Sequence, residues 1–286
     1  MKTQNQSCFT FGKLLAVAAA CLAFQSAQAT LLFQDGFNYA AGGLNASDVS
    51  TAPYSGNAWS SGSSHITVVA NDLTYPSMAD LGTNAVQDAW GVSAGSVINT
   101  FANQTGVGNS VYYSFLVQCT AAPAASAYLT DLNPLSSTPN GSSDPLAVYV
   151  QTLGSGWEVG VASGGSAKVY ASSPTTLLLN TTYLIVAEYT FGTAGIGTAN
   201  IYIDPTVGGT QPVIPYATVN SVSASSTAID NLGFKAQSSA GGFLLDNAIV
   251  GTTWQDVTTA VPEPSTLALA GLGLIGLVAR FRRARE

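Results

Sequence analysis

The chain has 286 residues, of which only 8% are charged and 47% are hydrophobic. Between Thr30 and Val261 there are two lysines against eleven aspartates and two glutamates, a formal charge of −11. A surface of that sign repels phosphate backbones, which excludes nucleic acid as an expected partner, and so low a charged fraction is unusual for a cytosolic enzyme.

The N-terminus has the layout of an export signal. A polar lead with two lysines comes first, and the apolar run 14–24 and the small-residue sequence Ala27-Gln28-Ala29 follow it. This order predicts a secretory signal peptide over residues 1–29, in a helical form, with cleavage by signal peptidase after Ala29. We therefore expect the mature chain to work outside the cytoplasm.

The cysteines leave one alternative to that cleavage. Ala18-Ala19-Ala20-Cys21 loosely resembles a lipobox, in which Cys21 would be lipidated, although the usual Leu three residues before the cysteine is missing. Cleavage after Ala29 removes Cys8 and Cys21 and leaves Cys119 alone, so no intramolecular disulfide can form. Cys119 ends an alternating apolar run, which favours a small core residue.

Residues 30–258 read as one all-β domain. Apolar and polar residues alternate over five to nine positions, and clusters of Gly, Pro, Asn and Ser separate these runs. About a dozen strands with polar turns predict a two-sheet antiparallel β-sandwich, a jelly roll, whereas a propeller would need a block repeated at a fixed period. The predicted strands are 31–37, 65–70, 85–91, 110–119, 127–131, 146–152, 157–162, 167–171, 182–191, 198–204, 228–236 and 243–251.

Several of these stretches resemble laminin-G-like or concanavalin-like jelly rolls. The matching segments are Leu32-Phe-Gln-Asp35-Gly-Phe-Asn-Tyr39, Trp157-Glu-Val-Gly-Val161, 180–189 with 199–205, and Leu245-Asp246-Asn247 with the residues up to Trp254. The resemblance implies the sandwich fold, and a fold alone does not settle function.

The same resemblance suggests one metal site. In carbohydrate-binding sandwiches the first and last strands lie side by side, and an aspartate from each often holds a structural Ca²⁺. Asp35 and Asp246 occupy those strands here, and carboxylate oxygens are ligands that calcium accepts readily. The alternative is that each carboxylate only accepts hydrogen bonds from backbone N–H groups.

Few residues in the domain could carry catalysis. A Ser-His or Cys-His system would have to use His65, the one histidine, and no G-x-S-x-G elbow is present. Zinc would need more His or Cys than the chain offers. Glu158 and Glu188 are the only glutamates of the domain, and the Glu-x-Asp-x-x-Glu cluster of sandwich glycosidases is absent. We therefore expect no enzyme activity; a hydrolase or lyase would need one glutamate in an open cleft beside a second carboxylate.

Tryptophans could serve a binding function instead. Exposed indole rings stack on sugars, although scattered tryptophans in a sandwich are more often core residues. The four tryptophans are Trp59, Trp90, Trp157 and Trp254.

The C-terminus has three parts in a fixed order. Val261-Pro262-Glu263-Pro264 comes first, the uncharged run 267–279 follows, and an arginine-rich end completes the chain. This order resembles the PEP-CTERM sorting signal of Gram-negative bacteria. The resemblance implies that an exosortase recognises the Pro-Glu-Pro motif within residues 261–286, and that a transmembrane helix over about residues 266–281 places the arginines in the cytoplasm.

Together these features predict an exported protein of the cell surface or extracellular matrix, with a membrane-held intermediate and a structural or interaction role. The alternative is a lectin-like module that binds polysaccharide of the exopolysaccharide matrix.

Overall fold

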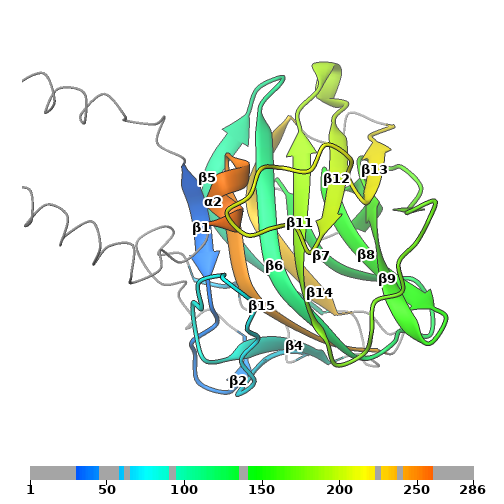
Figure 1. Ribbon diagram of the computed structural model, residues 1–286. Coiled ribbons are helices and arrows are strands. Elements are labelled where there is room, and N and C mark those ends of the chain that lie inside the picture. Colours follow the sequence, from blue (N-terminus) through cyan, green and yellow to red (C-terminus); the bar gives the residue numbers. More distant parts are fainter. Residues whose placement is uncertain are drawn as a thin grey trace, which may run out of the picture.

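The computed structural model describes residues 30–44, 58–60, 65–89, 95–134, 141–222, 227–236 and 241–259. This part of the chain is almost entirely β, and two antiparallel sheets pack face to face in one sandwich (Figure 1). The predicted jelly-roll β-sandwich is confirmed. The predicted signal helix and C-terminal transmembrane helix lie outside the described residues, and no described helix has the length and apolarity needed to cross a bilayer.

The larger sheet has nine strands, and its last strand in sequence lies near its centre. In spatial order it runs β13 (Ala217–Asn220), β12 (Thr198–Ile203), β11 (Thr182–Thr190), β6 (Ser110–Ala121), β15 (Gly242–Gly251), β4 (Ala85–Ala89), β3 (Ile66–Val69) and β2 (Gly42–Gly43), while β1 (Leu31–Asp35) pairs with β15. The first and last strands are therefore neighbours, as the resemblance to jelly-roll sandwiches implied.

The smaller sheet has six strands. Their spatial order is β10 (Val169–Tyr170), β9 (Gly156–Ala162), β8 (Leu146–Leu153), β7 (Ala127–Asn133), β14 (Ala228–Ala236) and β5 (Gly95–Thr105). Two 3₁₀ turns, η1 (Gly141–Ser143) and η2 (Thr193–Gly195), and one short helix, α2 (Trp254–Thr258), complete the described elements.

Each of the twelve predicted stretches contains a strand, but β2, β5 and β13 were missed. In β5 the inward positions are Val97, Asn99 and Phe101, all buried. An asparagine at the middle of such a run interrupts the apolar alternation by which strands are recognised. The other two missed strands have two and four residues, too few to show a period.

The core between the sheets is closed by aromatic contacts. Trp59 stacks on Phe234 with ring centroids 5.2 Å apart and meets the edge of Phe33 at 6.0 Å. Cys119 is fully buried among these apolar residues, which confirms it as a core residue. Burial raises the pKa of its thiol to about 12.

The two ends of the described chain meet at one place. Leu31 at the start of β1 pairs with Gly251 at the end of β15, and α2 begins three residues later. Figure 1 shows α2 at the end of the sandwich where β15 ends, and α2 contacts β15 and β6. The helix begins with a capping box, in which the Thr253 side chain accepts from the N–H of Asp256 and the Asp256 side chain accepts from the N–H of Thr253. Such a box satisfies two N–H groups that a helix start otherwise leaves unpaired.

Candidate functional site

Asp35 is a buried acceptor for three donors. Its Oδ1 accepts from the backbone N–H of Phe37 at 2.8 Å, and its Oδ2 accepts from Tyr39 Oη at 2.6 Å and Trp59 Nε1 at 2.8 Å. The N–H bond closes an Asx turn in which Phe37 takes a positive φ of 51°. Asp35 therefore fixes the turn after β1 and the tryptophan of the core.

The side chain of Asp246 lies on the opposite face of the nine-stranded sheet from that of Asp35. Its Oδ2 accepts from the N–H of Leu73 at 3.0 Å and its Oδ1 from the N–H of Asn247 at 2.7 Å. Burial, joined by the charges of Asp72 and Asp80, raises its pKa to about 8.

The two aspartates do not form one site, although their strands are neighbours. Trp59, which binds Asp35, belongs to the core between the sheets, whereas Leu73, which binds Asp246, belongs to the apolar cluster on the outer face of the nine-stranded sheet. The carboxylates thus lie on opposite faces of that sheet. The expectation that both hold one calcium ion does not fit this geometry, and for Asp246 the alternative of backbone N–H donors holds.

Glu188 of β11 accepts hydrogen bonds from several strands and one loop. Its Oε2 accepts from Asn200 Nδ2 at 3.0 Å, Tyr202 Oη at 3.2 Å and Gln211 Nε2 at 2.9 Å, and its Oε1 accepts from Ser110 Oγ at 3.3 Å. The side chain is only 6% exposed. These donors hold the carboxylate in place from β6, β12 and the loop that follows β12.

Glu158 of β9 belongs to the other sheet. Its Oε1 accepts from Gln151 Nε2 at 2.6 Å, and the residue is 3% exposed. The two glutamates therefore lie on different sheets and are both buried, so they do not flank one glycosidic bond.

Two other carboxyl groups do come together. Asp131 of β7 lies against Asp144, which follows η1, and both are buried. Asn133 Nδ2 donates to Asp131 Oδ2 at 2.8 Å. Burial, then the hydrogen bond and charge of Asp144, raise the pKa of Asp131 well above its ordinary value. Both carboxyl groups are closed from solvent, so the pair does not face a site that a substrate could enter.

A row of tyrosines crosses the six-stranded sheet beside this pair, on a face separate from the core. The row consists of Tyr128, Tyr149 and Tyr170, and the rings of Tyr128 and Tyr149 meet edge to face at 5.6 Å. Lys168 Nζ lies 4.3 Å from the centroid of the Tyr149 ring, and Lys235 Nζ lies 5.9 Å from that of Tyr128. The two lysines of the acidic body thus both lie on tyrosine rings of one face.

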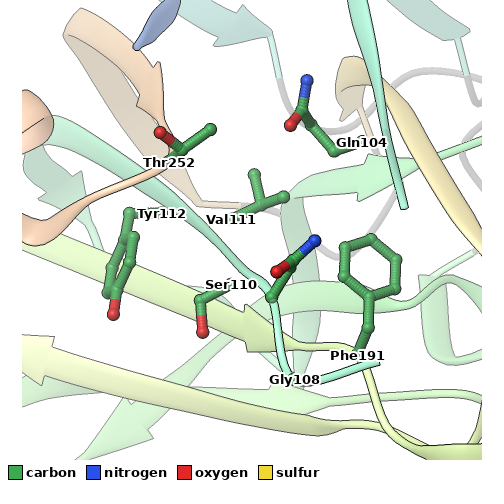
Figure 2. Close-up of a pocket in the computed structure, with 8 residues that line it drawn as sticks. Gln104, Gly108, Ser110, Val111, Tyr112, Phe191 and Thr252 are labelled. Atoms are coloured by element: carbon green, nitrogen blue, oxygen red, sulfur yellow. The ribbon is translucent and has the colours of Figure 1, made fainter. Parts of the chain in front are cut away.

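An open pocket lies at the turn between β5 and β6. Its volume is about 470 Å³, and Figure 2 shows hydroxyl and amide side chains around it together with two aromatic rings. Glu188 lies behind its wall, in contact with Ser110. A pocket with neutral donors and acceptors suits a neutral polar ligand. The lining residues are Gln104, Gly108, Asn109, Ser110, Val111, Tyr112, Phe191 and Thr252.

The tryptophans that the structure describes are core residues. Trp59 and Trp157 are fully buried and Trp254 is 3% exposed, so none offers an open indole face to a sugar. Trp90 lies outside the described residues. His65 lies in the turn that precedes β3 and is partly buried.

Sequence reasoning missed both the pocket and the carboxyl pair. Their members come from separate strands and loops, and no spacing along the chain connects them. The cleavage residues Ala27 and Ala29 and the motif residues Val261, Pro262, Glu263 and Pro264 lie outside the described residues.

Comparison with known families identifies the C-terminal segment. Residues 260–283 match the family model described as the PEP-CTERM protein-sorting motif. The motif implies export and exosortase processing. No curated protein sequence matches the chain.

The solved structures with similar sandwiches belong to proteins with different activities. An endo-β-1,4-glucuronan lyase from Trichoderma reesei is 14% identical, with a TM-score of 0.45, and the match covers 80% of this chain and 98% of that one. The catalytic domain of a glycoside hydrolase family 131 protein from Coprinopsis cinerea is 11% identical, with a TM-score of 0.47 and coverage of 82% and 98%. The globular domain of T. cruzi calreticulin is 12% identical, with a TM-score of 0.46 and coverage of 80% and 90%. None of these similarities assigns an activity to this chain.

Proposed function

We propose that this chain is a non-catalytic protein that is displayed at the cell surface or in the extracellular matrix of a Gram-negative bacterium after an exosortase cuts it at Pro262-Glu263-Pro264. The match of residues 260–283 to the sorting motif carries the proposal.

The junction with the folded body is short. Thr258 is buried in the last turn of α2, and Pro262 follows four residues later. Four extended residues span about 14 Å at most. The exosortase would therefore act close to the sandwich, with the body already outside the membrane.

The proposal that the protein is non-catalytic rests on the positions of its two glutamates. Glu158 and Glu188 are buried on different sheets, and Glu188 is occupied by donors from its own chain. A glycosidase needs two carboxyl groups on either side of one bond, at most about 10 Å apart. This arrangement favours a structural or interaction role.

The intact mass of the protein recovered from cells tests the processing. The full chain is expressed in a host with a working exosortase, beside a Glu263→Ala variant and a Glu286→Gln control outside the motif. We expect the parent and the control to begin at Thr30 and to lack the arginine-rich end, and the Glu263→Ala variant to keep it. Parent protein that keeps its whole tail in the inner membrane of this host would refute the proposal.

The non-catalytic role is tested separately on the same processed protein. Incubation with neutral and uronate-containing polysaccharides should release no new reducing ends and no unsaturated uronate. Release that Glu158→Gln or Glu188→Gln abolishes would show that the protein is an enzyme.

The pocket at the β5–β6 turn favours a second candidate function, the binding of a neutral glycan. Amide and hydroxyl groups of Gln104, Ser110 and Thr252 line it, and such groups pair with sugar hydroxyls. Binding of neutral oligosaccharides by calorimetry should weaken in Gln104→Ala and persist in Gln87→Ala, a partly buried residue of β4. No heat of binding across the panel would remove this candidate.

A further inference from the structure

The loop between β12 and β13 exposes an apolar tip. Its sequence Pro212-Val213-Ile214-Pro215 presents Val213 at 97% and Ile214 at 82% exposure, the highest values among the large apolar residues that the structure describes. Single exposed apolar residues are common on soluble proteins. Two adjacent β-branched residues at a tip stiffened by two prolines form a compact apolar surface that water does not favour.

The base of this loop is fastened to the helix that precedes the sorting motif. The backbone N–H of Gly208 donates to the carbonyl oxygen of Thr258 at 2.6 Å, and Trp254 Nε1 donates to the carbonyl oxygen of Gly209 at 3.1 Å. Gln211 then binds Glu188. Val213 lies four positions after Gly209, so the tip lies within about 14 Å of this attachment.

The chain beyond α2 limits how far the body can be from a membrane. The uncharged run of the tail begins at residue 267, eight residues after Thr259. Eight extended residues reach about 27 Å. While the tail is in the bilayer, α2 and the loop base attached to it therefore lie within about 27 Å of the membrane surface. At this separation the tip of the loop can reach the surface.

The charge of the loop permits its approach to a lipid surface. The body has a formal charge of −11, which an anionic lipid surface repels. The segment 205–229 contains no charged residue at all. The loop therefore lies in the part of the sequence that approaches a phospholipid surface without charge repulsion of its own.

From this arrangement we propose that Val213 and Ile214 contact the lipid bilayer while the sorting tail is still in the membrane, so that the body rests on the bilayer surface beside its own anchor. The inference rests on the proposed function, because it needs the tail to be membrane-held before the exosortase cuts. The contact orients α2 and the following motif relative to the membrane.

The test uses the tail-bearing chain from a host without exosortase, reconstituted in vesicles of phosphatidylethanolamine and phosphatidylglycerol. Ile214→Cys is labelled with an environment-sensitive dye, and Ser155→Cys, exposed in the β8–β9 hairpin of the other sheet, serves as the matched control. Spin-labelled lipids placed in the vesicles quench only dyes that reach the bilayer. Cys119 is buried and stays unlabelled.

We expect quenching at position 214 to exceed that at position 155 by about twofold or more, because interfacial side chains enter the headgroup region. Equal quenching at both positions, with the chain still in the vesicle fraction, would overturn the contact and leave the proposed function intact. A dye at position 214 that responds to protein concentration and not to the quencher would instead identify a second copy as the partner, which also overturns it. Recovery of the chain in the soluble fraction would show that the proposed anchoring itself fails.

Discussion

The backbone N–H of Thr252 donates to the carbonyl oxygen of Thr30 at 3.2 Å, so the first described residue is bound to the turn that follows the last strand. The signal-peptide side and the sorting side of the body therefore leave the sandwich at the same end. Under the proposed function, the same end of the body would face the membrane both before the signal is removed and before the tail is cut.

Asp88 should make the body less stable as the pH rises. The residue is 5% exposed, its Oδ1 has no hydrogen-bond partner, and burial raises its pKa to about 8. The folded state thus keeps a proton that the unfolded chain loses near pH 4, so its contribution to stability is full below pH 4 and falls through pH 8. We expect the free energy of unfolding in urea to decrease from pH 5 to pH 8.

The Asp88→Asn variant should flatten that pH dependence and exceed the parent in stability at pH 8, because the amide cannot ionise. At pH 4 and below the two proteins should differ little, because Asp88 is then protonated in both the folded and the unfolded chain. Asp246, whose pKa is also raised to about 8, should leave some pH dependence in the variant. A parent whose stability is constant from pH 5 to pH 8 would contradict the prediction.

Asp35 should be essential for folding stability and independent of calcium. Asp35→Ala leaves the N–H of Phe37, Tyr39 Oη and Trp59 Nε1 without their acceptor, at a cost of roughly 3–6 kcal/mol. Chemical denaturation measures the loss, and Thr83→Ala, at an exposed hydrogen bond, is the control. Removal of divalent ions with a chelator should leave the melting temperature of the parent unchanged, and a lower melting temperature would reinstate a metal site.

Glu188 and Glu158 allow a matched comparison, because each is a buried glutamate in a different sheet. Glu188→Gln weakens the hydrogen bonds that Asn200, Tyr202 and Gln211 donate to the carboxylate. We therefore expect a loss of roughly 2–4 kcal/mol in the free energy of unfolding. Glu158→Gln alters one hydrogen bond, from Gln151, and should cost about 1 kcal/mol or less. Equal losses would show that the Glu188 network adds nothing beyond a single bond.

The helix before the sorting motif should depend on its cap. Thr253→Ala removes the acceptor for the N–H of Asp256 and should destabilise the helix by about 1 kcal/mol. Hydrogen exchange of the amides in α2 should accelerate accordingly, whereas Thr253→Ser should keep the protection. Unchanged exchange in the alanine variant would mean that the packing of Trp254 alone holds the helix.

The alternation of apolar residues predicted most of the sandwich because each strand buries one face at a period of two. β5 was missed where Asn99 takes a core position, and α2 was missed because five residues cannot show a helical period. Propensity and spacing along the chain do not report such local exceptions.

The candidate site was less predictable because its contacts join distant residues. Asp35 binds Trp59 across 24 positions, and Asp131 meets Asp144 although 13 positions separate them in the sequence. That β1 and β15 pair was foreseen from the fold resemblance, but the β-bulge in β15 between Asp246 and Ile249 shifts the register, and no signal in the sequence indicated which face Asp246 would take. The sorting motif was predictable because its function is read from the linear chain.

The position of β15 also governs the timing of folding. This strand lies between β6 and β4 and is made of residues 242–251, which are among the last of the body to be synthesised. The nine-stranded sheet cannot be completed until that segment has crossed the membrane. During secretion the edges of β6 and β4 therefore stay unpaired. Under the proposed function, completion of the sandwich would coincide with the arrival of the sorting tail, so that the body would be folded when its anchor is in place.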